Sequence, residues 1–117
     1  IKTDISEIEN ACDIISALHP VKYKYTGEFR KQHPELENRY YYNFIAQELK
    51  EVLPNSVIKS NDYFEPIQDN LYQVNASDAL IISVKAIQDL MEENREMKKE
   101  LQEMKQEIEI IKSKLPE

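Results

Sequence analysis

The chain of 117 residues contains one glycine, one cysteine, two histidines and no tryptophan. Gly27 alone cannot build a phosphate-binding loop that needs several glycines, which excludes the dinucleotide-binding fingerprint and the P-loop. Cys12 has no partner for a disulfide within the chain, and with His19 and His33 it makes three scattered soft ligands. We therefore expect no structural metal site and no cofactor.

Long apolar runs and an excess of basic residues are also missing. The longest uninterrupted apolar run, residues 79–82, is far shorter than the roughly 20 residues that cross a bilayer. No signal-peptide pattern follows Ile1. The 15 Lys and Arg residues face 22 Asp and Glu residues, so the net charge is −7. This balance predicts no membrane span within the chain and no direct contact with nucleic acid, which requires a basic surface.

The last third of the chain carries a heptad pattern that begins at Leu80. Its first positions (a) are Leu80, Ile87, Asn94, Leu101, Ile108 and Leu115, and its fourth positions (d) are Ser83, Leu90, Met97, Met104 and Ile111. This apolar seam predicts a helix of roughly 54 Å that takes part in a coiled coil. We expect Ser77 or Asp78 to cap the helix and Pro116 to end it. The pattern therefore divides the chain into residues 1–79 and 80–117.

Charged residues flank the seam in a matched way. The e positions carry Lys98, Lys105 and Lys112, and the g positions carry Glu93, Glu100 and Glu107. In a parallel coiled coil the g residue of one chain meets the following e residue of its neighbour, so all three pairs are opposite in sign. A helix that folds back on its own domain would explain the seam but not these charges. The pattern predicts parallel helices in register.

The residue types in the seam also bear on the number of chains. Unbranched or γ-branched residues occupy most a and d positions, which favours a homotrimer over a dimer. Asn94 at an a position would lie among its own copies, where it lowers stability but penalises slipped registers.

The segment before the seam predicts a small α+β unit, beginning with an amphipathic helix capped by Thr3 or Asp4 and ended before Pro20. The apolar face of this helix is formed by Ile5, Ile8, Cys12, Ile15 and Leu18. Residues 21–25 alternate with period two and predict a strand. The polar residues 28–39 predict a loop.

The second half of this unit predicts further short elements. Residues 40–42 predict a strand, and a helix capped at Asn43 ends at Pro54. Its inward face consists of Phe44, Ile45, Leu49, Val52 and Leu53. Residues 56–59 and 71–74 predict two short strands that flank an acidic turn. The fold class is therefore α+β, a small globular unit with short strands and two helices, followed by a long C-terminal helix. Because its core is small, association through that helix is expected to add stability.

Few residues suggest chemistry by spacing alone. Glu48 and Glu51 lie three residues apart on one predicted helix, where paired carboxylates can act as acid and base. A solvated helix face accounts for them more simply. The residues by themselves thus predict a module that oligomerises through a coiled coil. Without a further site, such a module would not cleave proteins.

Three segments resemble a known family: IKTDISEIENACDIISALHPVKYKY, FIAQELKEVLPNSV and LYQVNASDALIISVKAIQDL. They resemble the intramolecular chaperone domain of endosialidase and related phage tail proteins, the S74 peptidase family. The most specific match runs from Phe44 to Leu49 and continues through Val52 to Pro54. The same domain occurs in the myelin regulatory factor family of membrane-tethered transcription factors, and the segment from Tyr25 to Phe29 resembles that branch somewhat more.

The resemblance implies a trimeric C-terminal domain that helps an upstream domain of its own precursor to fold and then cleaves the chain at its own N-terminal boundary. In the family this boundary reads Ser-Asp-x-Arg-x-Lys, with serine as nucleophile and lysine as general base. Lys2 matches the lysine, and the serine would lie four positions upstream of Ile1. This chain alone is therefore expected to be inactive. The resemblance implies the cytosolic side of an endoplasmic-reticulum-anchored precursor for the myelin regulatory factor branch, and virion tail assembly for the phage branch.

Overall fold

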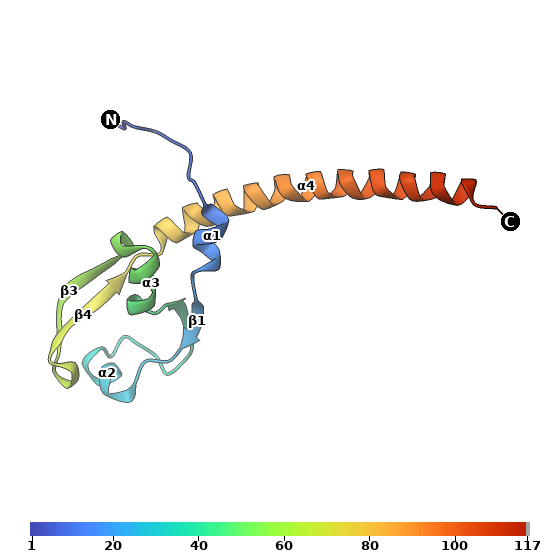
Figure 1. Cartoon of the computed structure of the whole chain (residues 1–117). Coiled ribbons are helices and arrows are strands. Elements are labelled where there is room, and N and C mark those ends of the chain that lie inside the picture. Colours follow the sequence, from blue (N-terminus) through green and yellow to red (C-terminus); the bar gives the residue numbers. More distant parts are fainter. Residues whose placement is uncertain (117) are drawn as a thin grey trace.

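One long helix dominates the computed structural model, which describes residues 1–116 (Figure 1). This helix, α4, spans Ser77–Lys114 and contains 38 residues, which corresponds to about 57 Å. The chain measures 80 × 42 × 21 Å, and its radius of gyration of 23.6 Å far exceeds the roughly 13 Å of a compact chain of this length. The outer part of α4 therefore projects away from the remaining elements. We call α4 the rod and residues 11–76 the head.

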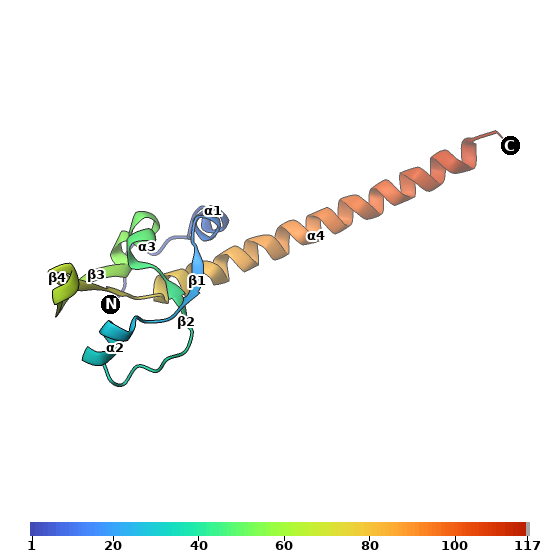
Figure 2. The same cartoon turned by 90° about the horizontal axis from the view of Figure 1, so that it is seen from below.

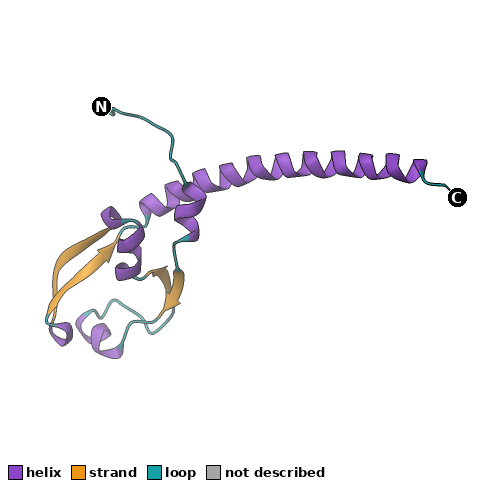
Figure 3. Ribbon diagram, viewed as in Figure 1, coloured by secondary structure: helices purple, strands orange, loops and turns teal. Residues whose placement is uncertain are grey.

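The head contains two separate antiparallel sheets of two strands each (Figure 3). The first pairs β1 (Pro20–Tyr23) with β2 (Tyr41–Phe44), and the second pairs β3 (Val57–Phe64) with β4 (Asp69–Val74). A sheet of two strands is at best marginally stable alone. The second sheet packs against α3 (Ala46–Val52), and Tyr41 of the first sheet stacks edge-on against Tyr25.

Three short helices and two 3₁₀ turns complete the head. The helices are α1 (Ala11–Ser16), α2 (Gly27–Gln32) and α3 (Ala46–Val52), and the turns are η1 (Pro54–Ser56) and η2 (Glu65–Ile67). The α+β class and the long C-terminal helix are confirmed. The head contains three α-helices in its described residues, where the sequence predicted two.

The first helix is much shorter than its apolar spacing predicted. Asp4 and Asn10 both adopt left-handed backbone conformations, with φ of 54° and 58°, which interrupt any helix through residues 1–10. Those residues form an extended arm that leads away from the head (Figure 1). Ile5, predicted on the buried face, is 85% exposed. The predicted caps therefore begin no helix.

The predicted loop over residues 28–39 is wrong in its first part, because α2 occupies it. The hydroxyl oxygen of Thr26 accepts a hydrogen bond from the backbone N–H of Phe29 at 3.1 Å, which caps the helix. Glu28 in the first turn and Arg30 in the last turn complement the helix dipole. These local signals explain a helix in a segment with little apolar content.

The third helix begins later than predicted. Asn43, the predicted cap, belongs to β2, and Ile45 precedes the helix without a capping hydrogen bond from its side chain. Leu49 on α3 is 2% exposed and is the largest fully buried side chain of the described residues. Tertiary burial of this leucine thus stabilises a helix that lacks a polar cap.

The second sheet is longer than predicted, because part of the predicted acidic turn belongs to its strands. Lys59 on β3 forms an ion pair with Asp69 on β4, with 2.7 Å between Nζ and Oδ1. The chain reverses through η2 and Gln68, whose φ of 52° is left-handed. This cross-strand ion pair adds a modest contribution to the stability of the hairpin.

The base of α4 is the point at which the head is attached. Helix α1 crosses its first turns, an arrangement visible from two directions in Figures 1 and 2. Ala11 on α1 and Ala79 and Ala86 on α4 are 1%, 4% and 4% exposed. The Sγ of Cys12 on α1 lies 3.6 Å from the backbone oxygen of Ala86. Small side chains on both helices allow the backbones to approach closely. Neither Ser77 nor Asp78 caps α4; instead, the side-chain oxygen of Asn75 accepts from the N–H of Ser77 at 2.9 Å.

No helix among the described residues has both the length and the apolar character that a membrane span requires. Within the same residues, no cluster of three or more His, Cys, Asp or Glu side chains is arranged to hold a metal ion.

Candidate functional site

The apolar seam of α4 lies on the surface of the chain. Its apolar members are 48% to 65% exposed. They are Leu80, Ile87, Leu90, Met97, Leu101, Met104, Ile108, Ile111 and Leu115. Asn94 is exposed in the same row, and Leu115 directly follows the end of the helix. A continuous apolar face of this size on an isolated chain marks an interaction surface.

One predicted seam position near the start of α4 is only half-exposed. Ser83, at a d position, donates a hydrogen bond from its hydroxyl to the backbone carbonyl of Ala79 at 2.6 Å. Ser83 is half-buried, whereas the apolar seam residues named above are exposed. The exposed seam is therefore complete only from Ile87 outward.

The glutamates beside the seam have no ionic partner within the described chain. Glu93, Glu100 and Glu107 form no ion pair among residues 1–116. The ion pairs that do occur along the outer part of α4 leave these glutamates out: Arg95 pairs with Glu92, and the e-position Lys112 lies 3.8 Å from Glu109 of its own chain. The g-position carboxylates therefore remain available to a neighbouring chain.

Lys2 lies on the extended arm and is exposed to solvent. The arm is held to the base of α4 by Lys85, whose Nζ lies 3.7 Å from Glu7 Oε2 and 3.1 Å from Asp89 Oδ1. The hydrogen bond to Asp89 raises the pKa of the Lys85 ammonium. In the described part of the chain Lys2 has no hydrogen bond or ion pair, so a single protomer does not position it.

The two histidines each connect separate parts of the head. His19 Nδ1 lies 2.9 Å from Glu48 Oε1, so Glu48 belongs to an exposed hydrogen-bonded contact rather than to a pair with Glu51. His33 Nε2 lies 2.9 Å from Asp62 Oδ2. The hydrogen bond to Asp62 and a second one to a backbone carbonyl raise the pKa of His33. Sequence spacing alone did not suggest either partner, because each histidine is far from its carboxylate along the chain.

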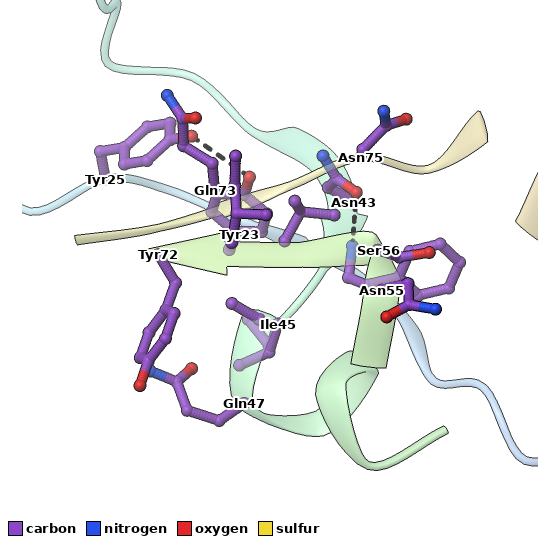
Figure 4. Close-up of a pocket in the computed structure, with 14 residues that line it drawn as sticks. Tyr23, Tyr25, Asn43, Ile45, Gln47, Asn55, Ser56, Tyr72, Gln73 and Asn75 are labelled. Carbon is purple, nitrogen blue, oxygen red and sulfur yellow. Dashed lines mark hydrogen bonds between the residues drawn. The ribbon is translucent and has the colours of Figure 1, made fainter. Parts of the chain in front are cut away.

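A cleft of about 660 Å³ opens between the two sheets (Figure 4). Tyrosines and side-chain amides dominate its lining: Tyr23, Tyr25, Tyr72, Asn43, Gln47, Asn55, Gln73 and Asn75. The hydroxyls of Tyr23 and Tyr25 lie 3.3 Å apart, and burial together with this contact raises the pKa of Tyr23 to about 12. No charged side chain lines the cleft, so it offers no general acid or base suited to neutral pH.

Comparison with known proteins identifies the family of the head. A family model described as chaperone of endosialidase, Peptidase_S74, matches residues 1–58. The chain belongs to the chaperone-of-endosialidase family. The matched region runs from the arm to the start of β3 and includes the first two resembling segments quoted above. A search among curated proteins found no match.

Membership in the chaperone-of-endosialidase family implies that the head is a chaperone domain of a peptidase family with self-cleaving members. The structure adds residues that sequence reasoning missed, above all Ala11 and Ala86 at the contact of α1 with α4. The signal for this contact that the sequence offered was Ala86, a small residue on α4 outside the seam. It could not be interpreted without knowledge of which segment packs there.

Proposed function

We propose that this chain is an intramolecular chaperone that trimerises an upstream domain of its own precursor and releases it by self-cleavage at the N-terminal boundary of the head. The observation that carries the proposal is the exposed seam of α4 with its unpaired g-position glutamates. Burial of that seam supplies affinity, and the flanking charges select a parallel orientation. Exposed ionic pairs are each worth only a few tenths of a kcal/mol, so they set register more than strength.

Lys2 is the proposed general base of the cleavage, acting on a serine upstream of Ile1. A lysine acts as a base only when its environment favours the neutral amine, through burial or neighbouring cations. The exposed arm of one protomer does not supply such an environment. We therefore assign its formation to the assembled precursor, in which neighbouring chains and the upstream segment surround the arm.

The assembly part of the proposal is tested by sedimentation equilibrium of the chain. We expect a mass near three times 13.8 kDa at micromolar concentration. A monomer would contradict the proposal.

The chemical part is tested in a precursor that includes the natural residues upstream of Ile1. Lys2→Met and Lys2→Arg should both leave the trimer intact and abolish cleavage, because arginine keeps the charge but cannot act as a base. Lys99→Met, on the exposed surface of α4, is the matched control and should cleave normally. The masses of the fragments show whether each precursor was cleaved.

A non-proteolytic oligomerisation module is the competing function, and the exposed position of Lys2 is the observation that favours it. In that case the unmodified precursor stays at full length while remaining trimeric. Cleavage of Lys2→Met at the normal rate would instead remove this lysine from the mechanism.

A further inference from the structure

The apolar surface of α4 is wider near the head than along the rest of the rod. Beside the seam, Ile81, Val84 and Met91 are 58%, 48% and 51% exposed. Ile81 occupies a b position of the heptad, and Val84 and Met91 occupy e positions, which flank the seam on one side. We call these three residues the basal flank. An apolar flank at positions that are usually polar suggests that another surface covers it.

The opposite side of the same turns is already covered by the head. Ala79 and Ala86 occupy g positions and are each 4% exposed, and α1 contacts Ala86 on this side of α4. The Sγ of Cys12 on α1 lies 3.6 Å from the backbone oxygen of Ala86. Helix α1 therefore lies along the g side of the base, and the basal flank lies on the e side.

Coiled-coil geometry relates these two sides when two copies are considered. In a parallel coiled coil, each g residue lies beside the e residue of the following heptad in the neighbouring chain. The register that pairs the glutamates and lysines of the outer rod also places Val84 beside Ala79 of a second copy. In the same register Met91 lies beside Ala86 of the second copy, at the place where α1 of the second copy packs on α4.

The residue types at e and g change along α4 where α1 no longer covers the helix. At e positions, Val84 and Met91 are followed by Lys98 and two further lysines, and at g positions the alanines are followed by glutamates. Ile110, at a c position farther along, is an apolar residue outside this pattern. The base thus carries apolar pairs and the outer rod carries ionic pairs, in one continuous register.

We propose that the basal flank of each protomer packs against α1 of a second copy of this chain, so that each head is held between two rods. This inference rests on the proposed trimer and extends its interface from the rod to the head. An antiparallel partner would place its own α1 at the far end of the rod and would bring like charges together at the flanks. Ile14 and Leu18, on α1 or just after it, are half-exposed and provide apolar surface for this contact.

The first experiment compares two charge-matched double variants of the full chain by sedimentation equilibrium. Val84→Glu with Met91→Glu places two carboxylates on the basal flank, and Gln88→Glu with Gln102→Glu places two on the exposed b positions. Burial of an unpaired charge is costly, so the first variant should weaken association by about ten-fold or more. The second variant should associate as the unmodified chain does.

The second experiment detects the contact directly by cross-linking with a short bismaleimide. Met91→Cys, in the chain that retains Cys12, should give covalent species of two and three chains on a denaturing gel. The same substitution combined with Cys12→Ser should give none, because Cys12 of the neighbour is the expected partner. Gln106→Cys lies far along the rod from Cys12 and is the control for chance cross-linking.

The outcomes separate this inference from the proposed function. A trimer that shows no Cys12-dependent cross-link between chains, and that tolerates the Val84 and Met91 substitutions, would overturn the inference and leave trimerisation intact. Cross-links confined to one chain would also overturn it, because α1 of the same chain would then cover the basal flank. If the unmodified chain is a monomer, the proposed function fails, and this inference fails with it.

Discussion

The thiol of Cys12 on α1 points at the backbone carbonyl oxygen of Ala86 on α4, with 3.6 Å between sulfur and oxygen. The two residues are separated by 74 positions in the chain, so this contact ties the start of the head to the base of the rod. Ala86 is 4% exposed, and its methyl group leaves no room for a larger side chain without displacement of α1. Head and rod are therefore coupled by a closely packed crossing, to which the hydrogen bond from the Ser56 hydroxyl to Asp78 at 3.4 Å adds a second contact.

The crossing predicts a sharp size limit at Ala86. Ala86→Leu should destabilise the chain by about 1–3 kcal/mol, because overpacking at a buried site forces side chains and backbone to shift. Urea unfolding at matched protein concentration measures the effect. Gln88→Leu, on the exposed surface of the same helix, is the control and should change the midpoint little. A midpoint for Ala86→Leu equal to that of the control would mean that α1 is not packed on this residue in solution.

Asn94 is expected to specify the assembly at a cost in stability. Asn94→Val should raise the thermal midpoint, because an apolar side chain replaces a polar one within the seam. It should also broaden the distribution of oligomers, which native mass spectrometry resolves. A more stable and still uniform trimer would show that Asn94 does not determine the oligomeric state.

Self-cleavage is expected to depend on the rod. Leu101→Asp with Ile108→Asp places two charges in each strand of the seam, at several kcal/mol for each unpaired buried charge, and should dissociate it. A precursor with both substitutions should stay uncut, because positioning of the reacting groups requires the rigid assembly. Replacement of the rod after Leu90 by a foreign trimeric coiled coil should restore cleavage. Efficient cleavage by a monomeric variant would make the rod a passive tether.

His33 predicts a pH-dependent contribution to stability. The hydrogen bond to Asp62 raises its pKa above 6.5 in the folded chain, so protonated His33 favours the folded state. The contribution is fully present below the unfolded pKa and is lost as the pH rises through the folded pKa. The difference in unfolding free energy between the unmodified chain and His33→Gln should therefore be largest well below pH 6.5 and shrink as the pH rises through the raised pKa of His33.

Asp62→Asn is the matched variant for this prediction. It should lower the pKa of His33, as followed by the ring-proton chemical shift, because the amide carries no charge to stabilise the imidazolium. A pKa of His33 that Asp62→Asn leaves unchanged would show that the contact is absent in solution.

Local patterns in the sequence were sufficient for the long helix and the α+β class. The heptad from Leu80 depends only on the spacing of apolar residues along one helix, and the structure forms that helix over Ser77–Lys114. Its end near Pro116 likewise follows from the missing backbone N–H of proline. The parallel orientation and the trimer follow from the flanking charges and the seam residues and remain predictions.

The tertiary structure decided what the periodic spacing left open. The spacing of Ile5 and Ile8 also suits a helix, yet residues 1–10 are extended, because left-handed residues interrupt the segment. At the base of α4 the heptad assigns Ser83 to the seam, whereas in the folded chain Ser83 is half-buried and its hydroxyl donates to the carbonyl of Ala79 on the same helix. A helical period indicates that a face is buried, but the covering segment comes from a distant part of the chain. Only the folded arrangement shows that α1 covers the g side and leaves the e side open.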